Sequence, residues 1–504
     1  MPIIEYTDFS GGINQQIGPV ITGSTQQQGM FYADDAKNFE MSQNGILKYK
    51  GYAKLLNSAL SGTPTITGAF EYFTSAGVRE LIVCAGGKVF KVSGGSATQI
   101  YTGHTAGYFY QGTTYKGTLI LCNGFDVPLQ YDGSTCTTIT FIDPNTIWDD
   151  ARPYGMVVFR GRCFYWDDTK VYTPKPDTFN DFNNNGNTVD GFVVDQGYGG
   201  NITRLQPLTD DALIIYKQRC IRRLSGSAPF GQPDQFTITP LSDDVGCLSG
   251  RSVVQVGIDH YFWSERGPRR LQTVQAYGDV NISQPSYNMP AILETVNWSY
   301  ASNICGVHDP NTGRVWWSYA TGASTTNSDI VVLDTDTQTI EPRYTGITAA
   351  SICYFNRQIV HGDYGGLVYN HGTTNAYDSA SIESYWKSKY IAHNGIGTYK
   401  RYRRLTLYSE ADGSGDVTVR WTILRDGVPI AQNATASVDA GANSWDTGLW
   451  DSAVWSTSET KVFHIKNLGR GTAIKLELFN TSAVQRPLIR QINLEYEVFG
   501  TNRG

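Results

Sequence analysis

The chain has 504 residues and a formal net charge of −6, with 17% charged side chains, 53 glycines, 31 tyrosines, 21 phenylalanines and 11 tryptophans. Many glycines for turns and many aromatic residues for strands indicate an all-β protein, and the acidic balance argues against a dedicated nucleic-acid binder, which needs a concentrated basic surface. A weakly acidic wall would still let DNA slide past without sticking, because like charges repel.

Residues 1–58 are predicted to form an N-terminal arm followed by a strand. The stretch between residues 15 and 28 is rich in glutamine and has little to bury, so we expect an extended arm or a surface loop. The pair Asn44-Gly45 is typical of a hairpin turn and predicts a strand near residues 46–49. We expect this strand to complete one unit of the ring that follows, which would remove the open edges of that ring.

Residues 59–380 contain hairpin-like cores that repeat along the chain. In residues 118–133, the apolar strand TLILC is followed by the turn Asn123-Gly124, a second strand and the turn Asp132-Gly133. Such a hairpin is only marginally stable alone, so it needs similar neighbours. Comparable cores lie at residues 81–92, 119–131, 157–172, 213–224, 260–271, 315–333 and 358–369. Their spacing, roughly 40 to 55 residues, is typical of four-stranded blades and predicts a β-propeller of about six to eight blades.

Two other segments differ from these repeats. The insertion at residues 174–200 is polar, rich in glycine and asparagine and too long for a tight turn, so we expect an exposed loop. Residues 381–504 are predicted to form a β-sandwich, because their strand patterns are longer and alternate between apolar and polar residues. These patterns occur at residues 403–409, 417–424, 462–468, 474–479 and 489–498.

The sequence predicts no catalytic, cofactor-binding or metal-ligating residue, and hence no enzyme and no cofactor. Carboxylate pairs occur at Asp149-Asp150, Asp210-Asp211 and Asp243-Asp244. Neighbouring residues on a strand point to opposite faces, so these pairs do not create the two facing carboxylates of a glycosidase. No HExxH, GxSxG or P-loop motif is present.

The eight cysteines form no CxxC pair and several lie inside apolar strands, such as Cys84 and Cys122. We therefore expect buried free thiols in a reducing compartment, and the spacing disfavours zinc. The N-terminus lacks a basic, apolar leader, and no run approaches the roughly 20 apolar residues of a membrane span. We expect a chain that is made soluble in the cytosol and does not insert into a membrane.

Two groups of side chains are candidates for an interaction surface. A basic residue recurs just before or inside most hairpin cores, at Arg79, Lys116, Arg160, Arg162, Arg219, Arg266, Arg314 and Arg357. One hypothesis is a ring of positive charge around a channel mouth or at a subunit interface; the alternative is that exposed turns simply carry charges.

Three tryptophans, Trp445, Trp450 and Trp455, form a cluster within the last segment. They could stack on sugar rings, because aromatic faces pack against pyranoses. They could equally be anchors of the sandwich core or of an interface.

Several motifs along the chain resemble one protein family. The opening motif of this family reads "F-x-G-G … N … G-x-L-x-x-R-x-G". The chain resembles it at Phe9-Ser-Gly-Gly, at Asn38 and at Asn44-Gly45-Ile-Leu-Lys-Tyr-Lys-Gly51, with lysine where arginine is usual. Further matches are Asn123-Gly124-Phe-Asp126 with Tyr131-Asp-Gly133, Asp243-Asp-Val-Gly246 with Phe262-Trp-Ser-Glu-Arg-Gly267, Trp450-Asp-Ser-Ala-Val-Trp455, and Ile492-Asn-Leu-Glu-Tyr496. In this order they resemble the β-propeller tail proteins of short-tailed bacteriophages, known as tail nozzle, tail hub or packaged-DNA stabilisation proteins.

The resemblance implies a structural virion protein that is assembled in the host cytoplasm and located in the phage tail. It implies a homohexameric ring below the portal and adaptor, in contact with other tail proteins, that retains genomic double-stranded DNA and forms the channel for its ejection. DNA would pass through this channel without sequence-specific contacts. The alternative is a carbohydrate-active or carbohydrate-binding propeller, either a tailspike-like depolymerase or a lectin.

Overall fold

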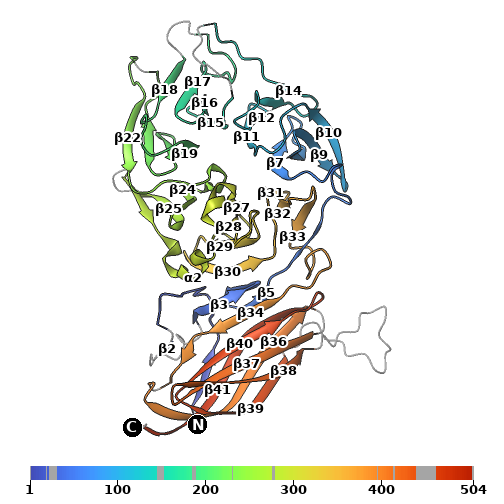
Figure 1. Cartoon of the computed structure of the whole chain (residues 1–504), viewed down its shortest axis with the longest axis vertical. Helices are drawn as coiled ribbons and strands as arrows, with labels where there is room; N and C mark the ends of the chain where they lie inside the picture. Colours follow the sequence, from blue (N-terminus) through green and yellow to red (C-terminus); the bar gives the residue numbers. More distant parts are fainter. Residues whose placement is uncertain are drawn as a thin grey trace.

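The computed structural model describes residues 2–18, 20–21, 31–144, 152–183, 189–229, 231–274, 279–393, 395–412, 415–438 and 461–501. Within these ranges the chain is an all-β protein with many small sheets. Figure 1 shows small sheets around a ring at one end of the molecule and long strands at the other end, where both termini lie. Short helical segments connect sheets of the ring: η1 (Gly250–Ser252), η2 (Pro285–Asn288), α2 (Pro290–Glu294) and η3 (Trp298–Asn303).

The ring is built from runs of four antiparallel strands that follow one another in the sequence. The first run consists of β7 (Ile66–Phe73), β8 (Arg79–Ala85), β9 (Lys88–Ser93) and β10 (Ser96–Thr102). The second consists of β11 (Gln111–Tyr115), β12 (Thr118–Cys122), β13 (Leu129–Tyr131) and β14 (Cys136–Thr138). The third consists of β15 (Gly155–Phe159), β16 (Arg162–Trp166), β17 (Lys170–Thr173) and β18 (Asp190–Val193). The predicted hairpin of residues 118–133 thus supplies the middle strands β12 and β13 of the second run.

The remaining runs continue the same pattern. The fourth run consists of β19 (Ile202–Thr209), β20 (Ala212–Lys217), β21 (Ile221–Ser225) and β22 (Thr237–Ser242), and the fifth of β23 (Val254–Val256), β24 (Asp259–Ser264), β25 (Gly267–Val274) and β26 (Asp279–Ser283). The sixth consists of β27 (Cys305–Asp309), β28 (Arg314–Tyr319), β29 (Asp329–Asp334) and β30 (Ile340–Thr345). The seventh contains β31 (Ser351–Phe355), β32 (Gln358–Gly362) and β33 (Val368–His371). The first strands of neighbouring runs contact each other, as β11 contacts β15 and β31 contacts β7, so they surround the centre of the ring.

The last run is completed by a strand from the N-terminal segment. This strand is β6 (Tyr52–Lys54), which pairs with β33 in the register Tyr52 to His371 and Lys54 to Tyr369. The sequence placed the closing strand near residues 46–49, a few residues too early. Gly51 explains the position, because a Cβ there would lie 2.0 Å from the carbonyl oxygen of Ala376, so only glycine lets the chain approach closely enough to enter the sheet.

Long strands form two sheets at the other end of the molecule. One contains β39 (Lys461–Gly471), β36 (Thr398–Asp412), β41 (Arg486–Thr501), β5 (Gly45–Lys48), β4 (Phe39–Ser42) and β1 (Ile3–Tyr6). The other joins β2 (Val20–Ile21), β35 (Tyr390–Ile391), β40 (Ala473–Asn480), β34 (Ser384–Ser388), β3 (Ala33–Lys37), β37 (Gly415–Arg425) and β38 (Val428–Val438), and continues into β30 of the ring. Leu405 and Leu494 from the first sheet share one hydrophobic core with Val419 and Leu476 from the second.

Strands from the first 58 residues therefore belong to both ends of the molecule. The strand expected at residues 46–49 is mostly β5, which pairs with β4 and β41 rather than with the ring. Among its described residues, much of the predicted N-terminal arm is strand: β1 and β3 pair with strands that are more than 300 residues away in the sequence, and β4 pairs with β5. The division of the chain at residues 58 and 380 remains a prediction.

The insertion at residues 174–200 is only partly a loop. It contains β18, which pairs with β17 and forms the outer strand of its run. Phe192 and Val194 are buried in a core cluster with Phe236, and this burial explains why a polar segment includes a strand.

The eight cysteines are all buried and free, as the sequence predicted.

Glycines let the first strands of the ring pack tightly. A Cβ at Gly155 in β15 would lie 2.3 Å from the ring of Trp166, and one at Gly306 in β27 would lie 2.6 Å from the ring of Trp317. The aromatic side chains of the second strands thus lie directly against the backbone of the first strands.

Candidate functional site

Two adjoining cavities lie at the centre of the ring. The outer cavity has a volume of about 330 Å³ and is lined by residues at or before the first strands and after the second strands of several runs. The inner cavity has a volume of about 180 Å³ and is lined mainly by residues of the first strands, together with residues of η1. Gln111, Gly250 and Arg251 line both cavities, so the two are neighbours.

Arg251 connects four parts of the ring at this boundary. It belongs to η1, just before β23. Its Nη1 donates to the carbonyl of Ala350 and its Nη2 to the carbonyl of Asn303, both at 2.9 Å. The guanidinium lies 3.6 Å from the ring centroid of Phe109, which precedes β11. Burial lowers the pKa of Arg251, so the surroundings disfavour its charge.

Arg204 in β19 supplies a second guanidinium, which lines the inner cavity. Its Nη1 donates to Oε1 of Gln111, and its Nη2 donates to Oε1 of Gln206 at 3.3 Å. Gln206 in turn donates from Nε2 to Oε1 of Gln255 at 2.7 Å, which extends the network to β23. Burial lowers the pKa of Arg204 to about 10.

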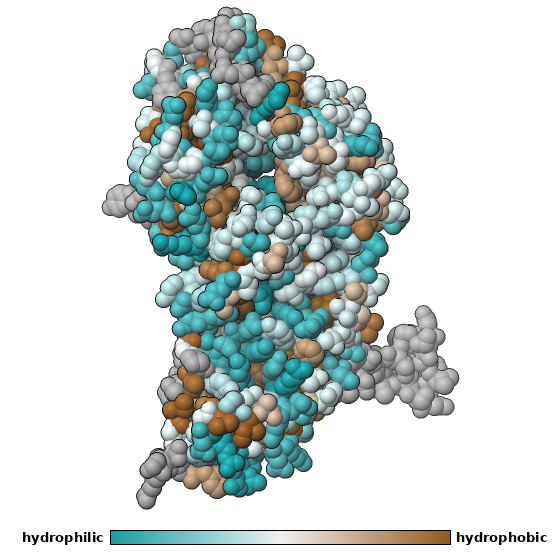
Figure 2. Space-filling view, in the orientation of Figure 1, coloured by the Kyte–Doolittle hydropathy of each residue, from teal (hydrophilic) through white to brown (hydrophobic). Residues whose placement is uncertain are grey.

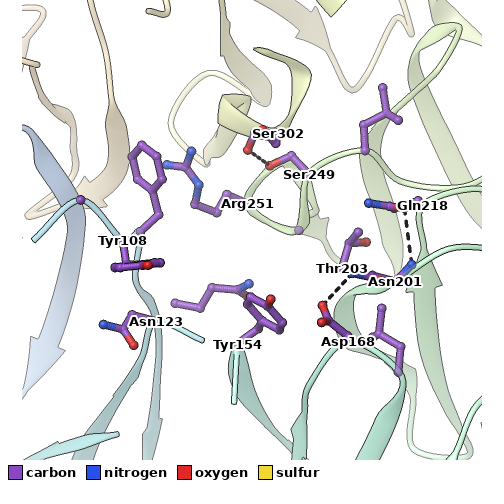
Figure 3. Close-up of a pocket in the computed structure, with 16 residues that line it drawn as sticks. Tyr108, Asn123, Tyr154, Asp168, Asn201, Thr203, Gln218, Ser249, Arg251 and Ser302 are labelled. Atoms are coloured by element: carbon purple, nitrogen blue, oxygen red, sulfur yellow. Dashed lines mark hydrogen bonds between the residues drawn. The ribbon is translucent and has the colours of Figure 1, made fainter. Parts of the chain in front are cut away.

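Aromatic and amide side chains form the wall of the outer cavity. Figure 3 shows Tyr108 and Asn123 on one side, Asp168 and Asn201 on the other, and Tyr154 between them. Asn201 donates from Nδ2 to Oδ1 of Asp168 at 2.7 Å. Burial, together with the charge of Asp168 and a hydrogen bond to it, raises the pKa of Tyr154 to about 12.

The turn that follows β12 holds this wall in place. Oδ1 of Asn123 accepts from the backbone N–H groups of Phe125 at 3.0 Å and of Asp126 at 2.8 Å. Phe125 stacks on Tyr108 with ring centroids 4.2 Å apart. Gly124 lies under Tyr154, because a Cβ there would be 2.3 Å from its ring. The Asn-Gly turn that the sequence predicts therefore positions two aromatic residues of the cavity.

The eight basic residues proposed as a ring do not lie on one annulus. Six are in the turn between the first and second strands or at the start of the second strand: Arg79, Lys116, Arg160, Arg162, Arg314 and Arg357. Arg219 and Arg266 are in turns between the second and third strands. Because antiparallel strands reverse direction, these two turns lie at opposite ends of a sheet, which corrects the idea of equivalent positions.

Most of these basic side chains also have acidic partners. Nζ of Lys116 lies 3.0 Å from Oδ1 of Asp177, and Arg160 forms an ion pair with Asp211 in the next run. The other ion pairs join Arg79 to Glu71, Arg219 to Glu265, and Arg314 to Glu40 and Glu341. Arg162 is buried. The ion pairs lower the net positive field that these residues could present to DNA.

The remaining candidates give no second site. Trp445, Trp450 and Trp455 lie outside the described residues, so their role remains a prediction. Among the described residues, no group of three or more histidine, cysteine, aspartate or glutamate side chains could hold a metal ion. Over the same part of the chain, no helix is long and apolar enough to cross a membrane. Figure 2 shows hydrophilic and hydrophobic side chains mixed over the visible face of the ring.

Sequence reasoning missed Arg204 and Arg251, which carry the positive charge of the two cavities. A signal existed for Arg204, because it lies within a strand whose Ile202 and Leu205 are buried. Placing it at the centre of the ring, however, required knowing that β19 is the first strand of its run.

No protein family model and no curated protein matches the chain. Solved structures with a similar arrangement include the computationally designed Ika8 protein, with 13% identity and a TM-score of 0.36 over 63% of this chain and 99% of that one. Two others are the extracellular domain of BT4673 from B. thetaiotaomicron (11%, TM-score 0.45, 82% of this chain and 64% of that one) and BamB from Moraxella catarrhalis (10%, TM-score 0.37, 65% and 93%). Because these three TM-scores are below 0.5, the description of the fold rests on the strand pairing of the chain itself.

Proposed function

We propose that this chain is a structural tail protein of a short-tailed bacteriophage. It forms a ring-shaped nozzle or hub below the portal and adaptor, retains the genomic DNA and provides the channel for its ejection. In this proposal the ring of sheets is a seven-bladed β-propeller closed by β6, and the two sheets with long strands are a β-sandwich joined to it. The chain acts through assembly and carries out no catalysis.

The observation that carries this proposal is that residues of the opening motif occupy positions that this fold requires, and that Gly12 and Asn38 among them contact the ring. Phe9 packs edge-on against Trp386 with ring centroids 6.1 Å apart. A Cβ at Gly12 would lie 2.4 Å from the carbonyl oxygen of Ile340, and one at Gly45 would lie 2.3 Å from that of Ile489. These glycines adopt positive φ angles of 64° and 130°, which other residues rarely adopt.

Asn38, at the next position of the motif, likewise has a side chain and a backbone conformation that this fold requires. Its Nδ2 donates to the carbonyl of Glu383 at 2.7 Å, and its Oδ1 accepts from the backbone N–H of Thr345 and the hydroxyl of Tyr377, both at 2.9 Å. Its φ is 54°. The opening motif therefore contains residues that this fold needs, and in this proposal a fold shared with the tail-protein family accounts for the resemblance of the motif.

The DNA conduit in this proposal is the axis of the assembled subunits. The major groove alone is about 12 Å wide, whereas Arg204 and Arg251 reach across the centre of the ring in a single chain. Duplex DNA therefore runs between subunits, past surfaces whose basic residues are largely paired with carboxylates.

The oligomeric state tests this function directly. The purified chain is measured by native mass spectrometry and negative-stain microscopy, alone and with a phage adaptor and portal complex. The expected result is a ring of six copies that docks coaxially on the adaptor. A strict monomer that ignores tail components, or one that cleaves polysaccharide, would contradict the proposal.

The enzymatic form of the carbohydrate alternative gains no support from the central cavities. Asp168 is the single carboxylate among the described residues that line either cavity. Hydrolysis of a glycoside by the usual route needs two carboxyl groups that flank the bond. The depolymerase reading is therefore the weaker one at this site.

A further inference from the structure

Arg204 and Arg251 lack an acidic partner at the centre of the ring. Within the described residues, the four oxygens that accept hydrogen bonds from them are neutral: Oε1 of Gln111, Oε1 of Gln206, and the carbonyls of Asn303 and Ala350. The described lining of the inner cavity contains no carboxylate. Two positive charges thus face one small cavity whose described lining supplies no countercharge.

The cost of this arrangement is visible in the pKa values. Burial lowers the pKa of both guanidinium groups, for Arg204 to about 10. A charge that is partly removed from water is normally paired, because a neutral acceptor compensates only in part for the lost hydration. Several other arginines of the ring have carboxylate partners, such as Arg160 with Asp211, whereas the described partners of Arg204 and Arg251 are all neutral.

The cavities have the room and the donors for an anion. A water molecule takes up about 30 Å³ in the liquid, so an inner cavity of about 180 Å³ holds a small oxyanion together with some water. A guanidinium has five N–H donors, and the two carbonyls occupy one on each Nη atom of Arg251. The remaining donors can bind carboxylate or phosphate oxygens.

The nearest acid in the wall does not neutralise these charges. Asp168 lines the outer cavity but not the inner one, and it accepts a hydrogen bond from Asn201 at 2.7 Å. Tyr108 and Tyr154 offer aromatic faces in the same outer space, and Asn123 and Gln218 offer amides (Figure 3). The outer cavity is thus suited to the polar body of a molecule whose acidic group lies at Arg251.

We propose that the centre of the ring is an anion-binding site in which Arg251 and Arg204 bind an oxyanion group. The anion is either free inorganic phosphate or the acidic group of a larger polar molecule, such as a sugar acid, that enters through the outer cavity. The site belongs to each single chain, so it does not depend on the proposed role in a phage tail.

The test uses the full chain in a buffer of constant ionic strength. Isothermal titration and thermal unfolding are recorded with sodium phosphate, with sodium glucuronate and with neutral glucose. Phosphate binding alone identifies a free-ion site, and stronger binding of glucuronate identifies the acid group of a larger molecule. Because a ligand of the native state raises the unfolding temperature, both measurements report the same event.

Three variants assign the binding to the two arginines. Arg251→Gln and Arg204→Gln each remove a charged donor. Each should raise the dissociation constant of the anion roughly ten- to a hundredfold. The control Arg160→Gln removes an arginine in the turn between β15 and β16 that lines neither cavity, and should leave the affinity unchanged. If Arg251→Gln fails to fold because it connects several sheets, Arg204→Gln carries the test alone.

Two results would overturn the inference. One is the absence of measurable binding for both phosphate and glucuronate. The other is equal binding of glucose and glucuronate that neither arginine variant changes, which would identify a site for neutral sugars.

Discussion

Nδ1 of His361 lies 2.7 Å from Nε2 of His371, and the hydroxyl of Tyr49 lies 2.5 Å from Nδ1 of His371. The two histidines are on the adjacent strands β32 and β33, and Tyr49 lies just before β6, the strand that completes this sheet. Burial lowers the pKa of His361 to about 3, and burial with the neighbouring imidazole lowers that of His371 well below 6.5. The closure of the ring therefore depends on two neutral imidazoles.

Acid should destabilise the protein before most of its carboxylates titrate. Four buried histidines favour the neutral form in the folded state, since burial also lowers the pKa of His260 and His393 to about 4. In the unfolded chain their pKa is about 6.5, so the unfolded state binds more protons between pH 6.5 and 4. Stability is thus complete above pH 6.5 and falls below it, by up to roughly 1.4 kcal/mol per pH unit for each histidine.

Urea unfolding followed by tryptophan fluorescence between pH 7.5 and 4.5 measures this slope. Glu341 opposes it in part, because burial raises its pKa to about 7, so the folded state binds an extra proton there. Four histidines outweigh this single glutamate, and the net slope should be downward with acid. A free energy of unfolding that stays constant from pH 6.5 to 4.5 would contradict the argument.

Replacing Tyr52 should open the ring. Its side chain stacks on Tyr377 with ring centroids 4.9 Å apart and contacts Tyr369 and His361 edge-on, both at 5.0 Å. Tyr52→Ala should cost about 3–5 kcal/mol, the usual range for removing a buried aromatic ring. Tyr52→Phe keeps the ring and should cost less than about 1.5 kcal/mol. Both values come from urea denaturation at pH 7.5, and similar losses for the two variants would show that the hydroxyl matters rather than the packing.

The local turns of this protein could be predicted from the sequence, but the long-range partners could not. Asn123-Gly124 and Asp132-Gly133 form turns because glycine and asparagine favour these conformations whatever surrounds them. The two strand-like stretches at residues 45–48 and 52–54 look equally suitable to close the ring. Their assignment depends on β41 and β33, which are more than 300 residues away in the sequence.

The same limit applied to the candidate site. The basic residues do recur along the sequence. Some of them lie at the turn between the first and second strands of a run and others at the turn between the second and third strands, and these two turns are at opposite ends of a sheet. Arg204 and Arg251 meet Gln111, Phe109 and Ala350 at one point because separate runs converge on the centre of the ring. A local sequence pattern cannot predict these contacts, because they join residues of separate runs.

The cysteines should be unreactive in the folded protein. All eight are buried, and burial raises the pKa of Cys163 and Cys353 to about 12, which keeps the reactive thiolate scarce at neutral pH. Titration with an aromatic disulfide reagent at pH 7.5 should therefore label almost no thiol within minutes, and should label all eight in denaturant. Rapid labelling of one or more thiols under native conditions would show that a strand of the ring opens locally.

Lys48 should matter far more to stability than the exposed Lys116, although both are lysines with close partners. Lys48 has 0% exposure, and its Nζ donates to Oδ1 of Asn480 at 2.7 Å and to the carbonyl of Ser482 at 2.5 Å. Burial lowers its pKa to about 8, so at pH 7 the ammonium still holds β5 to the turn after β40. Lys48→Ala removes the charged donor from both acceptors, although Oδ1 of Asn480 still accepts from the backbone N–H of Ser482, and should cost about 1–3 kcal/mol in urea denaturation at pH 7. The control Lys116→Ala breaks an exposed ion pair to Asp177 and should leave the midpoint unchanged within error, since water and salt screen such pairs. Equal effects of the two substitutions would mean that the buried ammonium does not hold the N-terminal strand to the C-terminal sheets.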